Sequence, residues 1–150
     1  MNNTEKINRY QAFLPELEAI LKGETDMIVK MSVFAALLHE EMNFFWTGFY
    51  RVVSGELLLG PFQGTIACTH IGRGKGVCGT AWQRAETIVV KDVELFNGHI
   101  ACSSLSKSEI VVPIKNKLGE IIAVLDIDST EIDTFDDTDK YYLEQAVTFL

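Results

Sequence analysis

The sequence predicts an α+β fold in which a central antiparallel sheet carries helices from both ends of the chain on one face. Helical periodicity marks both ends of the chain, aromatic and β-branched runs fill the region between them, and short turns separate successive runs. Strands joined by tight turns are antiparallel, and helices outside a block of strands favour the α+β class. With 150 residues the chain has the usual size of one domain. We therefore expect residues 1–150 to form a single domain.

Two helices are expected before the first strand. The apolar residues of the first recur at spacings of three and four: Ile7, Tyr10, Leu14, Leu17 and Leu21. Pro15 interrupts this stripe, so we expect a kink or a new helix beginning there, and we expect Gly23 to end the element. The second helix repeats the pattern after Thr25 or Asp26 as N-cap, with Ile28, Met31, Ala35 and Leu38 as its stripe.

The sheet is expected to begin at residue 44. Residues 44–53 are rich in aromatic and β-branched side chains, and Ser54-Gly55 predicts a tight turn into a second strand, 56–59, that Gly60-Pro61 ends. The remaining elements follow from the same signals: a short helix over 77–85, a short strand over 87–90, and a hairpin of strands 109–115 and 120–129. Acidic residues at 136–139 suit the positive end of a closing helix, whose buried stripe is Leu143, Ala146, Val147 and Leu150.

Composition and charge exclude several classes of function. The net charge of −8 opposes binding to nucleic acid and to anionic membranes. The longest apolar run, near residues 121–125, is far shorter than the roughly 20 residues that a membrane helix needs. The N-terminus shows no secretory or lipidation signal, so a cytoplasmic location is expected.

The three cysteines point to thiol chemistry. Three cysteines cannot all pair within one chain, so reduced or catalytic thiols are favoured over a structural disulfide framework. Cys68 and Cys102 lie in turn-rich segments among Thr, His and Ser, where a thiolate can be reached and stabilised. Metal binding is the competing interpretation, since N and S ligands are available at Cys68, His70, Cys78, His99 and Cys102. Their spacing matches no known zinc pattern, and we expect no metal.

Acidic and aromatic residues on the predicted strands are further site candidates. Asp126 and Asp128 lie two apart, so both carboxylates project from one face of a strand, and together they suit acid catalysis or the binding of an ammonium group. A solvated strand end is the alternative for them, and also for Glu109. Aromatic residues on the first strand could wall a small ligand or pack in the core: Trp46, Phe49 and Tyr50.

Several of these segments together carry a resemblance to a known family. They are Asn43–Tyr50, Gly60–Gly64, Ala67-Cys68, Gly74–Ala81, His99–Cys102, Ser108–Pro113 and Leu125–Ser129. Over nearly its whole length the chain resembles the free methionine-R-sulfoxide reductases, which are enzymes made of a single GAF domain. The resemblance implies a GAF-like sheet with a ligand pocket on the face opposite the terminal helices. It implies reduction of free methionine sulfoxide without a cofactor.

The resemblance also assigns roles. Cys102 is similar to the nucleophile, Cys68 to the resolving thiol and Cys78 to a third cysteine of secondary role. Other positions match the acids that hold and protonate the substrate and the aromatic wall of its pocket: Glu109, Asp126, Asp128, Trp46 and Tyr50. A sulfoxide is attacked readily only when its oxygen is protonated, so a thiolate beside a neutral carboxyl is the required pair. The resulting disulfide would be reopened by thioredoxin.

The sequence departs from the family beside the nucleophile. Ser103 stands where the family usually has Asp, which affects the thiolate fraction of Cys102 or a loop contact. A GAF module that senses a small ligand or redox state without catalysis is the alternative function. The oligomeric state stays open, with a homodimer as one alternative, and so does the choice between Cys68 and Cys78 as resolving thiol.

Overall fold

The fold is built on one six-stranded sheet, which we describe from a computed structural model of residues 1–150. The strand order is β3-β2-β1-β6-β5-β4, and every neighbouring pair is antiparallel. This confirms the predicted antiparallel sheet. The strands are β1 (Trp46–Val53), β2 (Glu56–Gln63), β3 (His70–Gly72), β4 (Ile88–Val90), β5 (Ser108–Lys115) and β6 (Ile121–Ser129).

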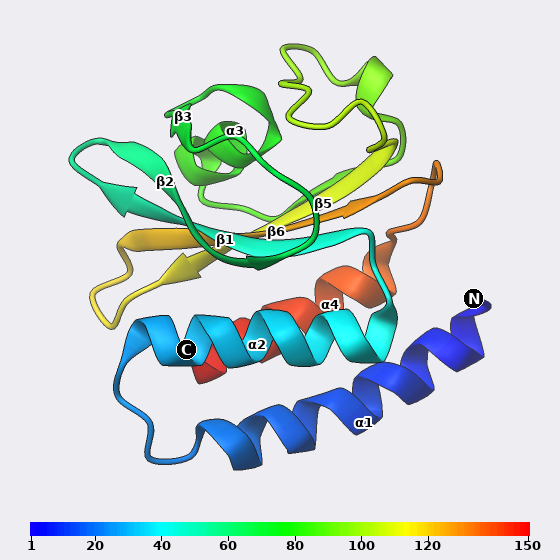
Figure 1. Ribbon diagram of the computed structural model, residues 1–150, viewed down its shortest axis with the longest axis vertical. Coiled ribbons are helices and arrows are strands. Elements are labelled where there is room, and N and C mark those ends of the chain that lie inside the picture. Colours follow the sequence, from blue (N-terminus) through cyan, green and yellow to red (C-terminus); the bar gives the residue numbers. More distant parts are fainter.

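The helices divide between the two faces of the sheet (Figure 1). The helices from the two ends of the chain, α1 (Asn3–Leu21), α2 (Met27–Met42) and α4 (Asp137–Ala146), cover one face, as the sequence predicts. The other face carries α3 (Gly76–Arg84) and the long loop that contains the 3₁₀ turn Val93–Leu95. None of the helices is both long and apolar enough to cross a membrane.

Residues of β1 and β6 alternate between two environments. Phe49, Leu125 and Ile127 are completely buried in the core under the terminal helices. Their neighbours along the strands point to the opposite face, where Trp46 and Tyr50 join a second apolar cluster together with residues of α3. Because side chains alternate along each strand, one face of the sheet packs in the core and the other face lines the site.

A buried polar network fixes α1 to α4. The Lys6 Nζ donates to Asp139 Oδ2 at 2.7 Å, and the Tyr10 hydroxyl donates to Asp139 Oδ1 at 2.6 Å. The Asp139 side chain also accepts the backbone N–H of Asp136 at 2.9 Å, which completes a capping box at the start of α4. The acidic cluster that predicts this helix thus also joins the two ends of the chain.

The structure corrects four expectations. Helix α1 continues through Pro15 without a new start; Pro15 and Gln11 are both exposed, so the carbonyl left without its helical N–H is open to water. Strand β2 continues past Gly60-Pro61 to Gln63, because these two residues lie at a register shift where proline is tolerated. Strand β3 was not predicted, since its three residues lie in a glycine-rich turn. Ile28 is 49% exposed, and Phe34 occupies the stripe of α2.

Candidate active site

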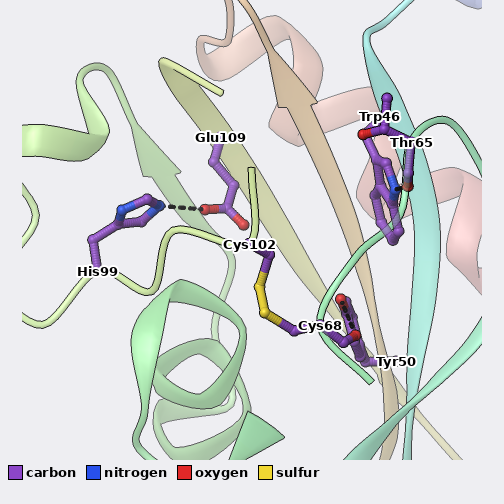
Figure 2. Close-up of a disulfide and its surroundings, with 7 residues drawn as sticks. All are labelled: Trp46, Tyr50, Thr65, Cys68, His99, Cys102 and Glu109. Atoms are coloured by element: carbon purple, nitrogen blue, oxygen red, sulfur yellow. Dashed lines mark hydrogen bonds and ion pairs between the residues drawn. A yellow bond between two sulfur atoms is a disulfide. The ribbon is translucent and has the colours of Figure 1, made fainter. Parts of the chain in front are cut away.

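A disulfide between Cys68 and Cys102 borders the site (Figure 2). Cys68 lies between β2 and β3, Cys102 lies in the loop before β5, and their Cα atoms are 5.3 Å apart. Both residues are half-buried. The structure therefore brings together the two cysteines that the sequence places in turn-rich segments, across 34 residues of chain, and it leaves Cys78 as the free thiol.

Two side chains of β1 hold the segment that carries Cys68. The Tyr50 hydroxyl donates to the carbonyl oxygen of Cys68 at 2.9 Å, and the Trp46 Nε1 donates to the carbonyl oxygen of Thr65 at 2.9 Å. Both aromatic residues are buried beneath this segment. They therefore wall the site and also position the backbone of one disulfide partner.

The aromatic wall depends on a glycine between its two members. The Trp46 ring stacks on Tyr50 at 6.0 Å between centroids and on Phe62 at 5.3 Å. A Cβ at Gly48 would come within 2.6 Å of the Trp46 ring, so a larger residue would displace it. Of the three aromatic candidates, Phe49 is wrong as a wall residue, because it points to the core on the other face of the sheet.

Three carboxyl groups meet on the floor of the site. Glu109 lies directly opposite Asp128 in the register of β5 and β6, and Asp126 lies two residues further along the same face. Glu109 and Asp126 are each only 6% exposed, and Asp128 is half-buried. The alternative of solvated strand ends is therefore wrong for Glu109 and Asp126. All three line a cavity of about 40 Å³ under the disulfide.

Burial makes these carboxyl groups reluctant to ionise. Loss of water raises the pKa of Glu109 well above its ordinary value, and the charges of Asp126 and Asp128 raise it further. Burial also raises the pKa of Asp126 and of Asp128. Three acids this close cannot all be charged in a poorly solvated cavity, so at least one proton is retained. The site contains the neutral carboxyl that acid catalysis needs.

Cys78 lies beside the acids, away from the disulfide. It follows Gly76, whose φ of +59° starts α3 in a conformation that favours glycine. Its Sγ and one oxygen each of Glu109 and Asp126 lie within 4.8 Å of one another. Burial and the neighbouring carboxylates raise the pKa of the Cys78 thiol well above its ordinary value, so this cysteine is held as a thiol.

The loop before β5 adds a histidine whose contact with the acids the sequence did not show. The His99 Nε2 lies 3.8 Å from Glu109 Oε1 (Figure 2), and burial lowers the pKa of His99. A neutral imidazole thus faces a carboxyl that tends to stay protonated. His99 and Glu109 are 10 residues apart, with a loop between them, and no sequence pattern predicts that they lie close together. Only the fold reveals this pair.

The five-ligand metal site considered from the sequence is not assembled. His70 lies on β3 and its Nδ1 contacts Glu56 Oε1 at 2.9 Å on the exposed surface. Cys68 and Cys102 are bonded to each other. Ser103, next to Cys102, accepts the backbone N–H of Leu105 through its Oγ at 3.2 Å and so shapes the turn after Cys102.

Comparisons with known proteins place this fold and site. Residues 16–150 match the GAF domain family. The chain is 44% identical to the free methionine-R-sulfoxide reductase of Escherichia coli, over all of this chain and 89% of that protein. It is 39% identical to the Saccharomyces cerevisiae protein of the same name, over 99% of this chain and 87% of that one.

Solved structures agree with the sequence relatives. The X-ray structure of free methionine-R-sulfoxide reductase from Neisseria meningitidis in complex with its substrate superposes with a TM-score of 0.93 at 47% identity, over 96% of this chain and 87% of that chain. The chain therefore belongs to the GAF domain family and, within it, to the free methionine-R-sulfoxide reductases, which are oxidoreductases.

Proposed function

We propose that this chain reduces free L-methionine-R-sulfoxide to methionine. The observation that carries the proposal is that Cys102, bonded to Cys68, lines the same cavity as a buried carboxyl cluster in which the pKa of Glu109 is raised. A disulfide is the product state of such a reduction, and a neutral carboxyl is the group that activates a sulfoxide. The relatives from Escherichia coli and Saccharomyces cerevisiae, which carry this activity in their names, support the substrate class.

In the proposed first step, Cys102 acts as the nucleophile and Glu109 as the acid. Glu109 gives its proton to the sulfoxide oxygen as the Cys102 thiolate attacks the sulfur. The oxygen passes to Cys102, methionine leaves, and Cys102 becomes a sulfenic acid. The substrate sulfur is reduced by two electrons and the Cys102 sulfur is oxidised by two. Glu109 then recovers its proton from solvent.

In the proposed second step, Cys68 resolves the sulfenic acid. The Cys68 thiol displaces water from Cys102 and forms the disulfide that the structure shows. An external dithiol then attacks this disulfide, and we propose thioredoxin as that reductant. The half-buried position of both cysteines keeps the disulfide within reach of a second protein. Cys78 takes no part in the pairing, because it is buried beneath the acids.

Substrate recognition follows from the charges and shape of the cavity. We propose that Asp126 and Asp128 bind the ammonium group of the free amino acid and that Trp46 and Tyr50 contact its apolar end. Cys102 cannot attack a sulfoxide while it is bonded to Cys68, so productive binding requires the reduced form. A peptide would bring no charged α-ammonium and would be bound poorly.

The test is methionine release from separate R and S epimers of free methionine sulfoxide, with dithiothreitol as reductant. We expect turnover of the R epimer alone and none by Cys102→Ser. The matched variant is Cys68→Ser, which without reductant should release about one methionine per chain and leave a sulfenic acid on Cys102 that dimedone labels. Methionine release by Cys102→Ser would overturn the assignment of the nucleophile. Binding of either epimer without release would favour the ligand-sensing GAF module instead.

A further inference from the structure

One side of the cavity carries a thiol and carboxyl groups, which become anions when they ionise, and no basic side chain neutralises them. Cys78, Glu109 and Asp126 are all buried, and no lysine or arginine forms an ion pair with any of them. Lys75 lines the cavity but makes no such contact. The only basic side chain in contact is His99, 3.8 Å from Glu109, and burial lowers its pKa.

One atom on this side of the cavity has no partner at all. Asp126 is 94% buried, and its Oδ1 has no hydrogen-bond partner while its carboxyl lines the cavity. A buried carboxylate oxygen without a partner is costly, and native proteins seldom keep one without a ligand or ion to satisfy it. The oxygen is therefore free to accept a ligand from the cavity.

The ligand atoms around that position suit a particular kind of ion. One atom each from Cys78, Glu109 and Asp126 lie within 4.8 Å of one another, and tetrahedral zinc bonds of about 2.0–2.3 Å place ligands roughly 3.3–3.8 Å apart. The atoms therefore need to move together by at most about 1.0–1.5 Å, which lies within side-chain rotation. A thiol and two carboxyls favour Zn²⁺ over Mg²⁺ or Ca²⁺, which prefer six or more oxygen ligands.

We propose that the free protein binds one Zn²⁺ ion between Cys78, Glu109 and Asp126, with a solvent molecule as the fourth ligand. The ion bonds to Cys78 Sγ as the thiol proton leaves to solvent, and no group is oxidised or reduced. The ligand set differs from the one that the cysteine and histidine spacing suggested, because it uses neither His70 nor the disulfide cysteines.

The proposed ion has a consequence that rests on the proposed function. The same carboxyls would hold the zinc and the substrate, so Zn²⁺ acts as an inhibitor that competes with free methionine sulfoxide. Binding also needs no change in the disulfide, since Cys78 is the free thiol of the oxidised protein. Oxidised and reduced protein should both bind the ion.

The test is titration of the oxidised protein with Co²⁺, read from the sulfur-to-cobalt charge-transfer band in the near ultraviolet. With Cys68 and Cys102 bonded, a cobalt–thiolate band can arise only from Cys78. We expect one equivalent of Co²⁺ per chain, displaced by Zn²⁺, with the band lost in Cys78→Ser and the affinity lowered about tenfold or more in Asp126→Asn. Glu120→Gln, on the exposed β5–β6 turn, is the matched control and should bind normally.

Absence of the band, or a band that survives in Cys78→Ser, would overturn the site. Circular dichroism of Cys78→Ser separates lost ligation from lost folding, and Asp126→Asn tests the site with Cys78 intact. Free methionine sulfoxide should raise the Co²⁺ concentration needed for half-saturation of the reduced Cys102→Ser variant, which cannot consume the substrate. Failure to do so would overturn the shared use of the carboxyls. Because the readout needs no turnover, a protein that binds Co²⁺ but releases no methionine would disprove only the proposed function.

Discussion

Replacing Glu109 by Gln tests the acid at the centre of the proposed mechanism. The amide has the same shape and can still donate a hydrogen bond to the sulfoxide oxygen, but it cannot give up a proton to it. Positioned general acids contribute about 10²–10⁴-fold to rate, so we expect kcat to fall by that factor, equivalent to about 2.7–5.5 kcal/mol. Because Glu109 is 6% exposed and lines the cavity, the loss should fall on kcat more than on KM.

The pH dependence gives a second readout of the same variant. The required form of Glu109 is the protonated one, and burial with Asp126 and Asp128 raises its pKa. Activity should therefore persist above the usual range of a carboxylic acid and fall as pH rises through the raised pKa. Glu109→Gln should lack this decline. The titratable groups that face Glu109 are Cys78 on α3, His99 on the preceding loop, Tyr50 on β1, and Asp126 and Asp128 on β6.

The assay is methionine release at saturating free methionine-R-sulfoxide with dithiothreitol, from pH 5 to 9. Glu120→Gln is the control for the chemical change at an exposed site. A kcat of Glu109→Gln within about threefold of the wild type would refute the role of Glu109 as acid. Retention of the alkaline decline in the variant would assign that decline to another group.

Three further substitutions test the supporting structure. Lys6→Met leaves the fully buried Asp139 without its cation, and should lower the free energy of unfolding in urea by about 3–5 kcal/mol. Tyr50→Phe removes the hydrogen bond to the Cys68 carbonyl; it should cost about 0.5–1.5 kcal/mol and slow disulfide formation, measured by thiol counting after one turnover. Asp126→Asn removes a buried acid whose pKa is raised in the fold. It should therefore raise Tm at pH 7 by about 2–4 °C for each kcal/mol of stability gained. This gain should shrink at acidic pH.

Specific results would contradict these expectations. Glu5→Gln breaks the exposed pair with Arg9 and should cost less than about 1 kcal/mol. An equal effect of Lys6→Met would show that burial of the Asp139 pair does not matter. The sign for Asp126 follows from its raised pKa: the folded state binds the proton more tightly than the unfolded state, so ionisation at neutral pH destabilises the fold. A lower Tm for Asp126→Asn would mean that its carboxylate is compensated in the native protein.

The pattern of residues along each strand predicted the fold and part of the site. Alternation along β6 correctly placed Asp126 and Asp128 on the face opposite Leu125 and Ile127, because side chains on a strand alternate strictly. The placement of Glu109 beside them depends on the register of β5 against β6, and a single sequence does not fix which residues face each other across strands.

Other features depended on tertiary contacts that leave no local signal. The sequence placed Cys68 and Cys102 in reactive contexts, but the residue pattern alone left all three cysteines as candidates. The pairing of Cys68 with Cys102 is decided by how the segment held by Tyr50 meets the loop before β5. Pro15 predicted a helix break, yet solvent exposure lets α1 tolerate it. Local propensity gives way where solvent or tertiary contacts satisfy the backbone.

Ser103 follows the proposed nucleophile Cys102 in the chain, and Ser103→Asp tests what a carboxylate at this position does. Its Oγ accepts the Leu105 backbone N–H, and an Asp carboxylate can accept the same bond, so the turn should persist. The added charge beside Cys102 would oppose thiolate formation; at about 7 Å in a water-like medium this costs about 0.6 kcal/mol, or roughly threefold. Alkylation of reduced Cys102 by iodoacetamide at pH 7, in a Cys68→Ser background, should slow by that factor. A faster reaction would show that the carboxylate acts on Cys102 through the loop and not through its charge.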